Sequence, residues 1–409
     1  MTGQGKPDYE AILDVAIDVS AIKANSGGVR RYAHELIAQL PNQQIRPLLL
    51  ARANDTMAAW PGADRFIACA PTDRVRRLIW EQTSLAKTLK GAAPDIGILH
   101  SPHYTMPQSL SERKPRITNR FAKSGKRSRL KRVVTIHDLS YFTRPQDHSF
   151  DKRTLFTRAI AKAAQSADAL VCVSERTAQA LQEFVNVSAP VFVAPHGINH
   201  ERFRPLLGGK EGSGHTEAHN ALRAEDGQIR KTLGVEGDYI LSISAIEPRK
   251  NLAMLIRAYE ELLANDSSLR EISLVIGGEG WPGVVQNLPT STFGRVLFTG
   301  FVSEDAVAPL LRGARCVAYP SLEEGFGLPA LEALACGTPV VTTAGSVMHD
   351  LLGAAAIAVA VDRVEPLAAG LLMAVEGNGP PLATRLATAG TFTWTNSAAR
   401  HAAAYRSCR

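Results

Sequence analysis

The 409-residue sequence lacks several features that would assign it to a membrane or a secreted class. It has no run of eighteen apolar residues, which argues against a membrane-spanning helix. Its first ten residues lack the charged-then-apolar order of a signal peptide, so the cytoplasm is the expected location. Its five cysteines are scattered and form no C-x-x-C pair. Neither a disulfide framework nor a zinc knuckle is therefore expected.

Positive charge is concentrated in one segment. Residues 113–132 hold ten Lys and Arg and no acid, so the rest of the chain, at +7 less these ten, carries a net −3. One interpretation is a solvated loop; the other is an arm that contacts an anionic surface, either phospholipid headgroups at the inner face of the membrane or a pyrophosphate-linked acceptor. A nucleic-acid partner is not expected, because the segment has a single aromatic residue, Phe121, for base stacking.

Short apolar, β-branched segments alternate with helical patterns along both halves of the chain. Such alternation is typical of βαβ units and predicts two doubly wound parallel sheets. A polar, glycine-containing stretch at 208–230 is predicted to connect the two domains, 1–207 and 231–391. The expected strands are 12–19, 95–100, 133–138, 169–174 and 191–195 in the first half, and 239–244, 272–278, 296–300, 316–320, 339–343 and 356–361 in the second.

Ligands of open α/β sheets bind beyond the carboxyl ends of the strands, so the functional residues are expected in the loops that follow the strands. Gly27 and Gly28 follow the first predicted strand and precede an amphipathic helix. Paired glycines let a backbone approach a phosphate, although they are equally suited to a tight turn. His137 ends a strand that is otherwise apolar. A lone histidine at a strand end is more often structural than catalytic, and its place at the carboxyl edge raises the odds of a catalytic role.

The segment AIEPRKNL, residues 245–252, follows the first strand of the second half. Asn251 is predicted to cap the next helix, which places Arg249 and Lys250 beside the positive helix terminus. An Arg fork and a mobile Lys charge suit a diphosphate, whereas an isolated surface Arg-Lys pair would simply be solvated.

The segment EEGFGLPALEA, residues 323–333, holds two glutamates around a glycine turn. Gly325 and Gly327 can turn N–H groups toward an anion or sugar hydroxyls, and Pro329 suits the first helical position. Glu324 would precede the helix and Glu332 would lie near its first turn, with Gly337 as its C-terminal cap. One carboxylate could hold a ribose and the other a second sugar. Helix-terminus electrostatics alone would explain Glu324 but not the glycines.

These motifs together resemble the retaining glycosyltransferases of family 4, which have the GT-B architecture of two Rossmann-like domains facing a central cleft. Within the family, the chain looks most like bacterial mannosyltransferases of cell-surface polysaccharide biosynthesis. The resemblance covers most of the chain in family order. Its elements are Gly27-Gly28, residues 79–85, 137–142, 173–177, 195–205 and 248–251, the pair Glu324 to Glu332, and residues 392–406.

The resemblance implies a role for each matched residue. Glu332 would bind the donor ribose, and Glu324 would position the transferred sugar with the backbone of Gly325, Phe326, Gly327 and Leu328. Arg249 and Lys250 would neutralise the leaving diphosphate, and His137 would contact the sugar near its reacting carbon. Gly27 and Gly28 would border the phosphates. The segment 392–409 would return to the N-terminal domain as a helix.

The implied chemistry agrees with these residue types. Charge accumulates on the diphosphate as a nucleotide-sugar bond breaks, and fixed cations stabilise that charge. The sequence has no D-x-D motif, so neither a metal nor another cofactor is expected. Retention usually suggests a carboxylate nucleophile. The family resemblance instead implies same-face attack with the departing phosphate taking the acceptor proton, so Glu324 is assigned to positioning.

Two positions depart from the family pattern. Asn199 replaces an aspartate and is expected to alter a turn, and residues 346–352 replace a Leu-Pro-Glu-Val type segment, which is expected to weaken helix docking near the donor. The leading hypothesis is transfer of mannose from GDP-mannose to a lipid-linked or polysaccharide acceptor. A UDP-sugar donor (glucose, galactose or N-acetylglucosamine) stays open, because base recognition in this fold uses backbone near residues 300–302.

Three other classes are less consistent with the motifs. A nucleotide-sugar 2-epimerase would not be expected to combine PRKN with EEGFG. A non-catalytic subunit would be expected to have lost Glu324, Arg249 or Lys250, and all three are present. An NAD-dependent oxidoreductase needs G-x-G-x-x-G after its first strand, which NSGGVRRY does not supply.

Overall fold

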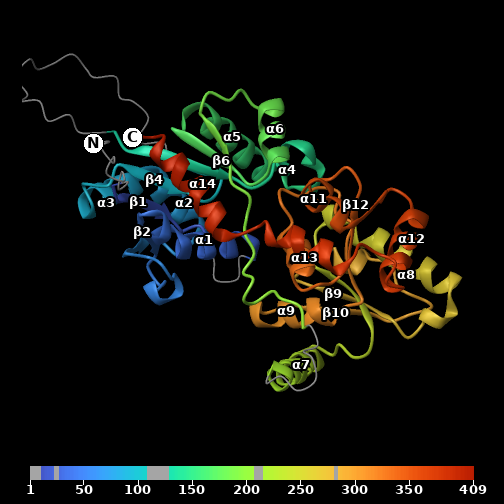
Figure 1. Cartoon of the computed structure of the whole chain (residues 1–409). Helices are drawn as coiled ribbons and strands as arrows, with labels where there is room; N and C mark the ends of the chain where they lie inside the picture. Colours follow the sequence, from blue (N-terminus) through green and yellow to red (C-terminus); the bar gives the residue numbers. More distant parts are fainter. Residues whose placement is uncertain (1–10, 23–26, 108–128, 207–214, 281–283) are drawn as a thin grey trace, which may run out of the picture. The chain divides into compact units, whose positions relative to one another are not determined.

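A computed structural model describes residues 11–22, 27–107, 129–206, 215–280 and 284–409 of the chain. The chain divides into two compact units (Figure 1). The first comprises Met1–Gly197 together with Trp394–Arg409, and the second comprises Ile198–Thr393. The change of unit thus falls at residue 197, ten residues before the boundary that sequence composition suggested, because residues 198–206 make their contacts within the second unit. One such contact is the bond from the Ile198 amide to the Phe392 carbonyl oxygen, 3.1 Å.

The first unit is an α/β layer structure built on one parallel sheet. Its strands are β1 (Leu13–Asp18), β2 (Ile45–Arg52), β3 (Arg65–Ala70), β4 (Ile98–Ser101), β5 (Lys131–Ile136), β6 (Ala169–Cys172) and β7 (Val191–Val193). Its helices are α1 (Gly28–Gln39), α2 (Arg74–Thr83), α3 (Leu85–Ala92), α4 (Ser140–Thr143), α5 (Phe150–Ser166), α6 (Glu175–Phe184) and α14 (Trp394–Arg406).

The seven strands of this sheet run in the order β3-β2-β1-β4-β5-β6-β7, and all pairs are parallel. The chain therefore reverses its direction of travel across the sheet between β1 and β4, which is the topological switch point of a Rossmann-like fold. Five of the strands were predicted, whereas β2 and β3 were not. Pro47 lies inside β2, opposite Val15 of β1, and a proline lacks the N–H that a central strand normally uses.

The closing helix α14 contributes polar groups to the core of the first unit. The Tyr32 hydroxyl lies 2.8 Å from both Thr135 Oγ1 and His401 Nε2, and the Tyr405 hydroxyl lies 2.8 Å from His100 Nδ1. All five side chains are fully buried. Burial lowers the pKa of His401 to about 4, so its imidazole is neutral near pH 7. These bonds connect the last residues of the chain to β4, β5 and α1.

The second unit has a six-stranded parallel sheet in the order β10-β9-β8-β11-β12-β13, the same Rossmann-like order. Its strands are β8 (Tyr239–Ile243), β9 (Ser273–Gly277), β10 (Val296–Gly300), β11 (Cys316–Tyr319), β12 (Val340–Thr343) and β13 (Ile357–Val359). Its helices are α7 (His215–Thr232), α8 (Leu252–Asn265), α9 (Glu304–Gly313), α10 (Leu328–Ala335), α11 (Val347–Leu352), α12 (Val364–Val375) and α13 (Leu382–Gly390). All six predicted strands are present.

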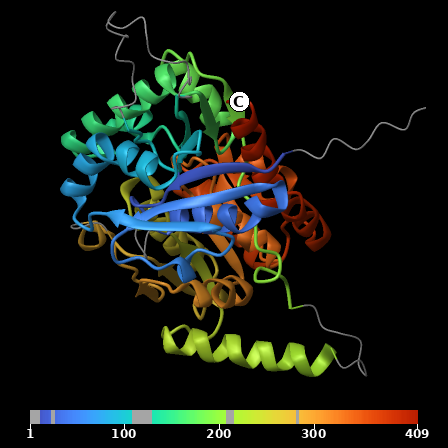
Figure 2. The same ribbon diagram turned by 90° about the vertical axis from the view of Figure 1, so that its left-hand side faces the viewer.

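The polar stretch 208–230 is not a simple connector. Residues 207–214 lie outside the described part, but residues 215–232 form α7, which lies at the border of the second unit next to α9 (Figures 1 and 2). Asp226 is buried and forms a two-bonded ion pair with Arg312 of α9, with both N–O distances 2.7 Å. Sequence composition did not indicate this helix, because its contacts with α9 include a buried ion pair, and charged residues in a sequence suggest a solvated segment.

The basic segment 113–132 is described only at its end. Residues 108–128 lie outside the described part, whereas Leu130 is buried in the core of the first unit and Lys131 begins β5. Lys131 Nζ lies 3.2 Å from Asp168 Oδ1, and the buried Arg132 donates its backbone N–H to Asp168 Oδ2 at 3.0 Å. The last charges of the segment are therefore part of the fold, so the expectation that they belong to a surface arm is wrong.

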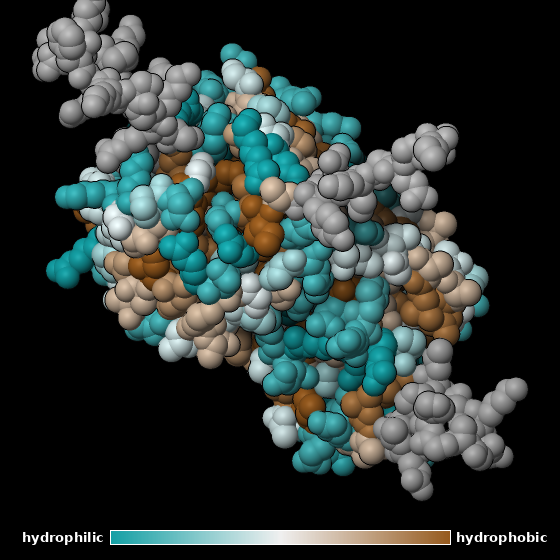
Figure 3. Space-filling view, turned by 60° about the vertical axis from the view of Figure 1, so that its left-hand side comes forward, coloured by the Kyte–Doolittle hydropathy of each residue, from teal (hydrophilic) through white to brown (hydrophobic). Residues whose placement is uncertain are grey.

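Apolar residues on the surface are scattered. Figure 3 shows small groups of apolar residues among hydrophilic ones on the face that it presents. Val75 and Ile79 of α2 and Phe150 of α5 are among the exposed large apolar side chains. Such isolated exposure is ordinary in soluble folds. Within the described residues, none of the helices combines the length and the apolar character needed to cross a bilayer.

Candidate donor site

The loop between β11 and α10 carries the predicted glycine turn and leads into a helix, as expected. Gly327 is the N-cap of α10 with a φ of 94°, in the left-handed region, and Pro329 occupies the second helical position rather than the first. Gly337, with a φ of 82°, follows the helix end and closes it. Glu332 is fully buried at the fifth helical position, so it lies in the second turn of the helix and not in the first.

Gly327 is required both by its backbone conformation and by its packing. A Cβ at this position would lie 1.8 Å from the sulfur of Met348. We expect Gly327→Ala to lower the free energy of unfolding by about 1–3 kcal/mol, through positive-φ strain plus the clash. Gly377→Ala is the matched control, because its φ of 79° carries the strain while no atom lies within 4 Å of the new Cβ.

Urea denaturation of both variants would measure the two effects. The structure predicts a larger loss for Gly327→Ala than for Gly377→Ala, and partial recovery when Met348→Ala is added to the former. Equal losses in the two variants would show that the contact with Met348 does not constrain the loop.

The second component of the site is the turn that precedes α8. Residues Pro248–Lys250 form one turn of 3-10 helix, and Asn251 follows in the left-handed conformation with a φ of 57°. The Asn251 side chain does not cap α8 as predicted; its Nδ2 donates to the Val361 carbonyl oxygen at 3.1 Å. The left-handed backbone turns this side chain away from the helix terminus. Arg249 and Lys250 nevertheless lie immediately before α8.

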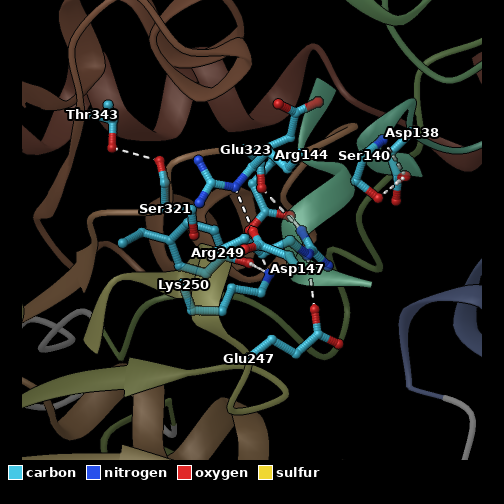
Figure 4. A network of polar contacts seen from close by, with 12 residues as sticks. Asp138, Ser140, Arg144, Asp147, Glu247, Arg249, Lys250, Ser321, Glu323 and Thr343 are labelled. Atoms are coloured by element: carbon cyan, nitrogen blue, oxygen red, sulfur yellow. Dashed lines mark hydrogen bonds and ion pairs between the residues drawn. The ribbon is translucent and has the colours of Figure 1, made fainter. Parts of the chain in front are cut away.

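The two cations converge on one carboxylate. Lys250 Nζ donates to Glu324 Oε1 in a short contact, and Arg249 Nη1 donates to Glu324 Oε2 at 3.0 Å. Arg249 also donates to the Glu323 carbonyl oxygen at 2.9 Å and, through Nε, to Glu247 Oε2 at 2.8 Å (Figure 4). These five side-chain and backbone partners are called the Arg-Lys-Glu cluster, which comprises Glu247, Arg249, Lys250, Glu323 and Glu324.

The order of the strands explains why the cluster forms. The loops that carry it follow β8 and β11, which are paired neighbours in the sheet. Their carboxyl ends therefore meet at the same edge. The amide of Leu322 donates to the Arg249 carbonyl oxygen at 2.8 Å, and Thr343 Oγ1 donates to the Ser321 carbonyl oxygen at 2.7 Å (Figure 4). The loop is thus anchored to its neighbours on both sides.

Burial makes the electrostatics of the cluster strong. Burial alone would raise the pKa of Glu324, but the charges of Lys250 and Arg249 outweigh it and lower the pKa to about 2. Burial lowers the pKa of Lys250, and the neighbouring Glu324 carboxylate opposes that effect. Two cations and the carboxylates of Glu247 and Glu324 balance each other in charge. Two positions in the cluster thus carry fixed positive charge whose geometry is set before any ligand arrives.

Two members of the cluster, Glu247 and Glu323, were not predicted as site residues. Glu247 lies two residues before Arg249 in the AIEPRKNL segment and orients the guanidinium through Nε. Tyr319 was also missed; it ends β11, and its hydroxyl lies 3.4 Å from Lys250 Nζ. An acidic residue close in sequence to a predicted cation pair, or a tyrosine at the end of a predicted neighbouring strand, would have indicated a partner for these cations.

Three further predicted residues, His137, Gly27 and Gly28, lie in the first unit. His137 follows β5, and its Nε2 lies 3.0 Å from the Pro102 carbonyl oxygen, with the Tyr32 ring in edge contact at 4.9 Å between ring centroids. Burial lowers the pKa of His137, so its neutral form is favoured. Gly27 is the N-cap of α1 with a φ of 58°, and among the described residues no atom lies within 4 Å of a Cβ built at Gly27 or Gly28. The glycine loop is therefore open to close approach by another group.

The two departures from the family pattern are both accommodated. Asn199 Oδ1 accepts a bond from the Arg202 backbone N–H at 3.2 Å, which holds a turn as an aspartate would. The segment 346–352 forms α11, capped by Ser346, with Val347, Met348 and Leu352 buried. Met348 packs directly against Gly327, so the segment contacts the donor loop, and the expected weakening of docking stays a prediction.

Comparison with known proteins follows the same division of the chain. Residues 26–202 match the family described as Glycosyltransferase Family 4, and residues 226–391 match the family described as Glycosyl transferases group 1. O-antigen chain mannosyltransferase B of Escherichia coli is 29% identical over 285 residues, which cover 68% of this chain and 71% of that protein.

Two further proteins are similar, one over a shorter part of the chain and the other at a lower sequence identity. A D-inositol 3-phosphate glycosyltransferase of Xylanimonas cellulosilytica is 31% identical over 247 residues, covering 57% of this chain and 55% of that protein. Sucrose-phosphate synthase from Thermosynechococcus elongatus has the same fold, with a TM-score of 0.68 at 18% identity over 96% of this chain and 98% of that one. Two matched domains in family order, on two Rossmann-like sheets, place the chain in the family 4 glycosyltransferases of GT-B fold.

Proposed function

We propose that the chain transfers mannose from GDP-mannose, with retention of configuration, to a lipid-linked or polysaccharide acceptor. The observation that carries the proposal is the Arg-Lys-Glu cluster. It joins a carboxylate that can accept bonds from sugar hydroxyls to two cations that can donate hydrogen bonds to phosphate oxygens, all within hydrogen-bonding distance. A nucleotide sugar has the same adjacency, because its hexose is bonded directly to the diphosphate.

The two cations act on the leaving group. Negative charge grows on the diphosphate as the sugar-phosphate bond breaks, and preorganised cations stabilise that charge without having to move. Arg249 offers a planar fork of donors, and Lys250 offers three hydrogens on a short rotatable head. These charges take the place that a divalent ion has in D-x-D enzymes, so we propose no metal and no other cofactor at the diphosphate.

Glu324 and the glycine turn act on the sugar and the nucleoside. Glu324 stays ionised at neutral pH, since its pKa is about 2, and can accept bonds from hexose hydroxyls, while the N–H groups of residues 325–328 follow directly on it. Glu332, buried in α10, is assigned to the donor ribose. His137 and the Gly27-Gly28 loop are assigned to the sugar and the phosphates from the first unit. Proton transfer from the acceptor to the departing phosphate needs no further base.

The donor base and the acceptor rest on weaker support. The mannose assignment comes from the named activity of O-antigen chain mannosyltransferase B, whereas the D-inositol 3-phosphate glycosyltransferase acts on a different acceptor. Phe301 follows β10 and is 53% exposed, and an aromatic face there would stack on guanine or uracil equally well. A UDP-sugar donor is therefore the second candidate. Peripheral contact with an anionic membrane through residues 113–128 is proposed on charge alone.

A thermal-shift panel tests the donor assignment. The wild-type protein would be melted with GDP-mannose, GDP, UDP-glucose, UDP-N-acetylglucosamine, UDP and NAD, because a ligand of the native state raises the melting temperature. We expect stabilisation by GDP and GDP-mannose, about 2.7 kcal/mol at a ligand concentration of 100 times Kd. Stabilisation by UDP ligands alone would replace mannose with a UDP-sugar, and no response to any nucleotide would contradict a transferase.

A further inference from the structure

Three side chains with metal-ligating atoms meet at the switch point of the first unit. Asp18 is the last residue of β1, and His103 lies two residues after β4, the strand paired with β1 on the other side of the reversal. Glu81 reaches the same place from α2. One ligand atom from each of the three lies within 4.8 Å of the others. Ligands of open α/β sheets bind at this point, beyond the carboxyl ends of the strands.

Two atoms of the group are buried without a hydrogen-bond partner among the described residues. Asp18 Oδ2 and His103 Nε2 face each other at 3.6 Å, and neither accepts or donates a bond within the described part of the chain. The Asp18 side chain is completely buried and the His103 side chain is 13% exposed. Leaving buried polar atoms unpaired costs their desolvation free energy without return, so a missing partner is expected between them.

The hydrogen bonds around His103 determine which tautomer is present. Thr105 Oγ1 donates its single hydrogen to Glu81 Oε2 at 3.0 Å, and the same Glu81 oxygen accepts a bond from Arg77 Nη1 at 2.8 Å. His103 Nδ1, 2.9 Å from Thr105 Oγ1, must then be the donor in that contact. In the neutral imidazole, Nε2 therefore presents a lone pair to the Asp18 carboxylate.

Two lone-pair atoms that face each other repel unless positive charge lies between them. A proton on Nε2 would have to span 3.6 Å, which is longer than a N–H···O bond. A sugar hydroxyl carries one hydrogen and would satisfy only one of the two atoms. A divalent ion with bonds of about 2.0–2.2 Å to nitrogen and oxygen ligands sets two tetrahedral ligands about 3.4 Å apart, close to the observed separation.

The hydrogen bonds that His103 and Asp18 make with neighbouring residues would hold both side chains in orientation to bind a metal ion. A metal-bound histidine usually donates its other ring N–H to a partner that fixes its orientation, as His103 does to Thr105. The second oxygen of Asp18 is held by the Ser20 backbone N–H at 3.0 Å. Arg77 Nη1 pairs with Glu81 Oε2 at 2.8 Å.

We propose that Asp18 Oδ2 and His103 Nε2, with Glu81 completing the set, bind one divalent transition-metal ion of the zinc class. Imidazole together with carboxylate is a ligand set for zinc rather than for calcium or magnesium. The site belongs to the first unit and does not depend on which donor the protein uses. The neutralisation of the diphosphate by Arg249 and Lys250 is a separate function.

Metal titration of the full-length protein tests the site. The protein is treated with a chelator, dialysed free of it, and titrated with zinc chloride by calorimetry and with cobalt(II) by visible absorption. We expect one ion per chain and the absorption bands of four-coordinate cobalt with nitrogen and oxygen ligands. Asp18→Asn and His103→Gln should lose this site. Thr105→Val, which touches no metal, should weaken binding about 10- to 100-fold by releasing the histidine.

His349→Gln is the matched control, because His349 is an exposed histidine of the second unit and its loss should leave one tight ion bound. The proposal is overturned if wild-type protein binds neither ion, or if Asp18→Asn and His103→Gln bind zinc as tightly as wild type. If either variant fails to fold by circular dichroism, Thr105→Val decides: unchanged zinc affinity in that variant would also overturn the proposal.

Discussion

Replacing Lys250 with alanine is expected to lower the kcat of sugar transfer about 10²- to 10³-fold, the effect of removing one preorganised group that stabilises developing negative charge. Lys250 is buried beside Glu324, where a charge acts more strongly than it does in water. The charge on the leaving diphosphate is larger in the transition state than in the bound donor. The loss should therefore appear mainly in kcat, with a smaller change in KM.

The matched control for this prediction is Lys231→Ala. Lys231 is an exposed lysine in the last turn of α7, within the same unit. The Lys231→Ala substitution removes the same formal charge from the unit without touching the cluster, so the kcat of this variant should equal that of wild type within error. Initial-rate measurements over a range of donor concentrations separate kcat from KM for both variants. A Lys250→Ala enzyme with wild-type kcat would remove this residue from the leaving-group chemistry.

Replacing Glu324 with glutamine is expected to affect stability and activity together. The pKa of Glu324 is held at about 2, against an ordinary value of 4.5, because Lys250 and Arg249 outweigh the effect of burial. A carboxyl group whose pKa is lower in the folded than in the unfolded state stabilises the folded protein at every pH above the unfolded-state pKa. This stabilisation is lost as the pH falls from 4.5 toward 2. A difference of this size corresponds to roughly 3 kcal/mol at neutral pH.

Glu324→Gln should therefore be less stable than wild type at pH 7 and should show a flatter dependence of stability on pH between 4.5 and 2. Its activity should also fall, since an amide accepts weaker bonds from sugar hydroxyls and leaves two cations without their carboxylate. Chemical denaturation at several pH values measures the first effect. Glu271→Gln, an exposed acid of the same unit, serves as the control. Parallel pH profiles for wild type and Glu324→Gln would refute the assigned ion pairs.

Much of the fold could be predicted because apolar, β-branched runs between helical patterns mark parallel strands. Eleven of the strands follow from that pattern. The strand β2 contains Pro47, and β3 is only partly buried along its length, so neither has the pattern of a central strand. The helix α7 was hidden for a different reason, because its tertiary contacts include the Arg312–Asp226 ion pair and not only apolar side chains.

The candidate site was predicted as separate motifs but not as one cluster. Arg249 and Lys250 are 75 and 74 residues from Glu324 in the chain, and only the adjacency of β8 and β11 brings them together. The sequence suggested cations free to meet a diphosphate, whereas the structure pairs both with a carboxylate. The convergence of Asp18, Glu81 and His103 was likewise not predictable, since it depends on a strand order that local patterns do not contain.

Calorimetric titration of GDP into wild-type protein and into the Arg249→Ala, Lys250→Ala double variant tests directly whether the Arg-Lys-Glu cluster binds the diphosphate. The cluster is proposed to hold the diphosphate, so wild type should bind GDP at one site per chain and the folded double variant should bind it much more weakly. The double variant Arg257→Ala, Lys231→Ala removes two exposed cations of the same unit and should bind as wild type does. Undiminished binding of GDP by the folded cluster variant would contradict the account.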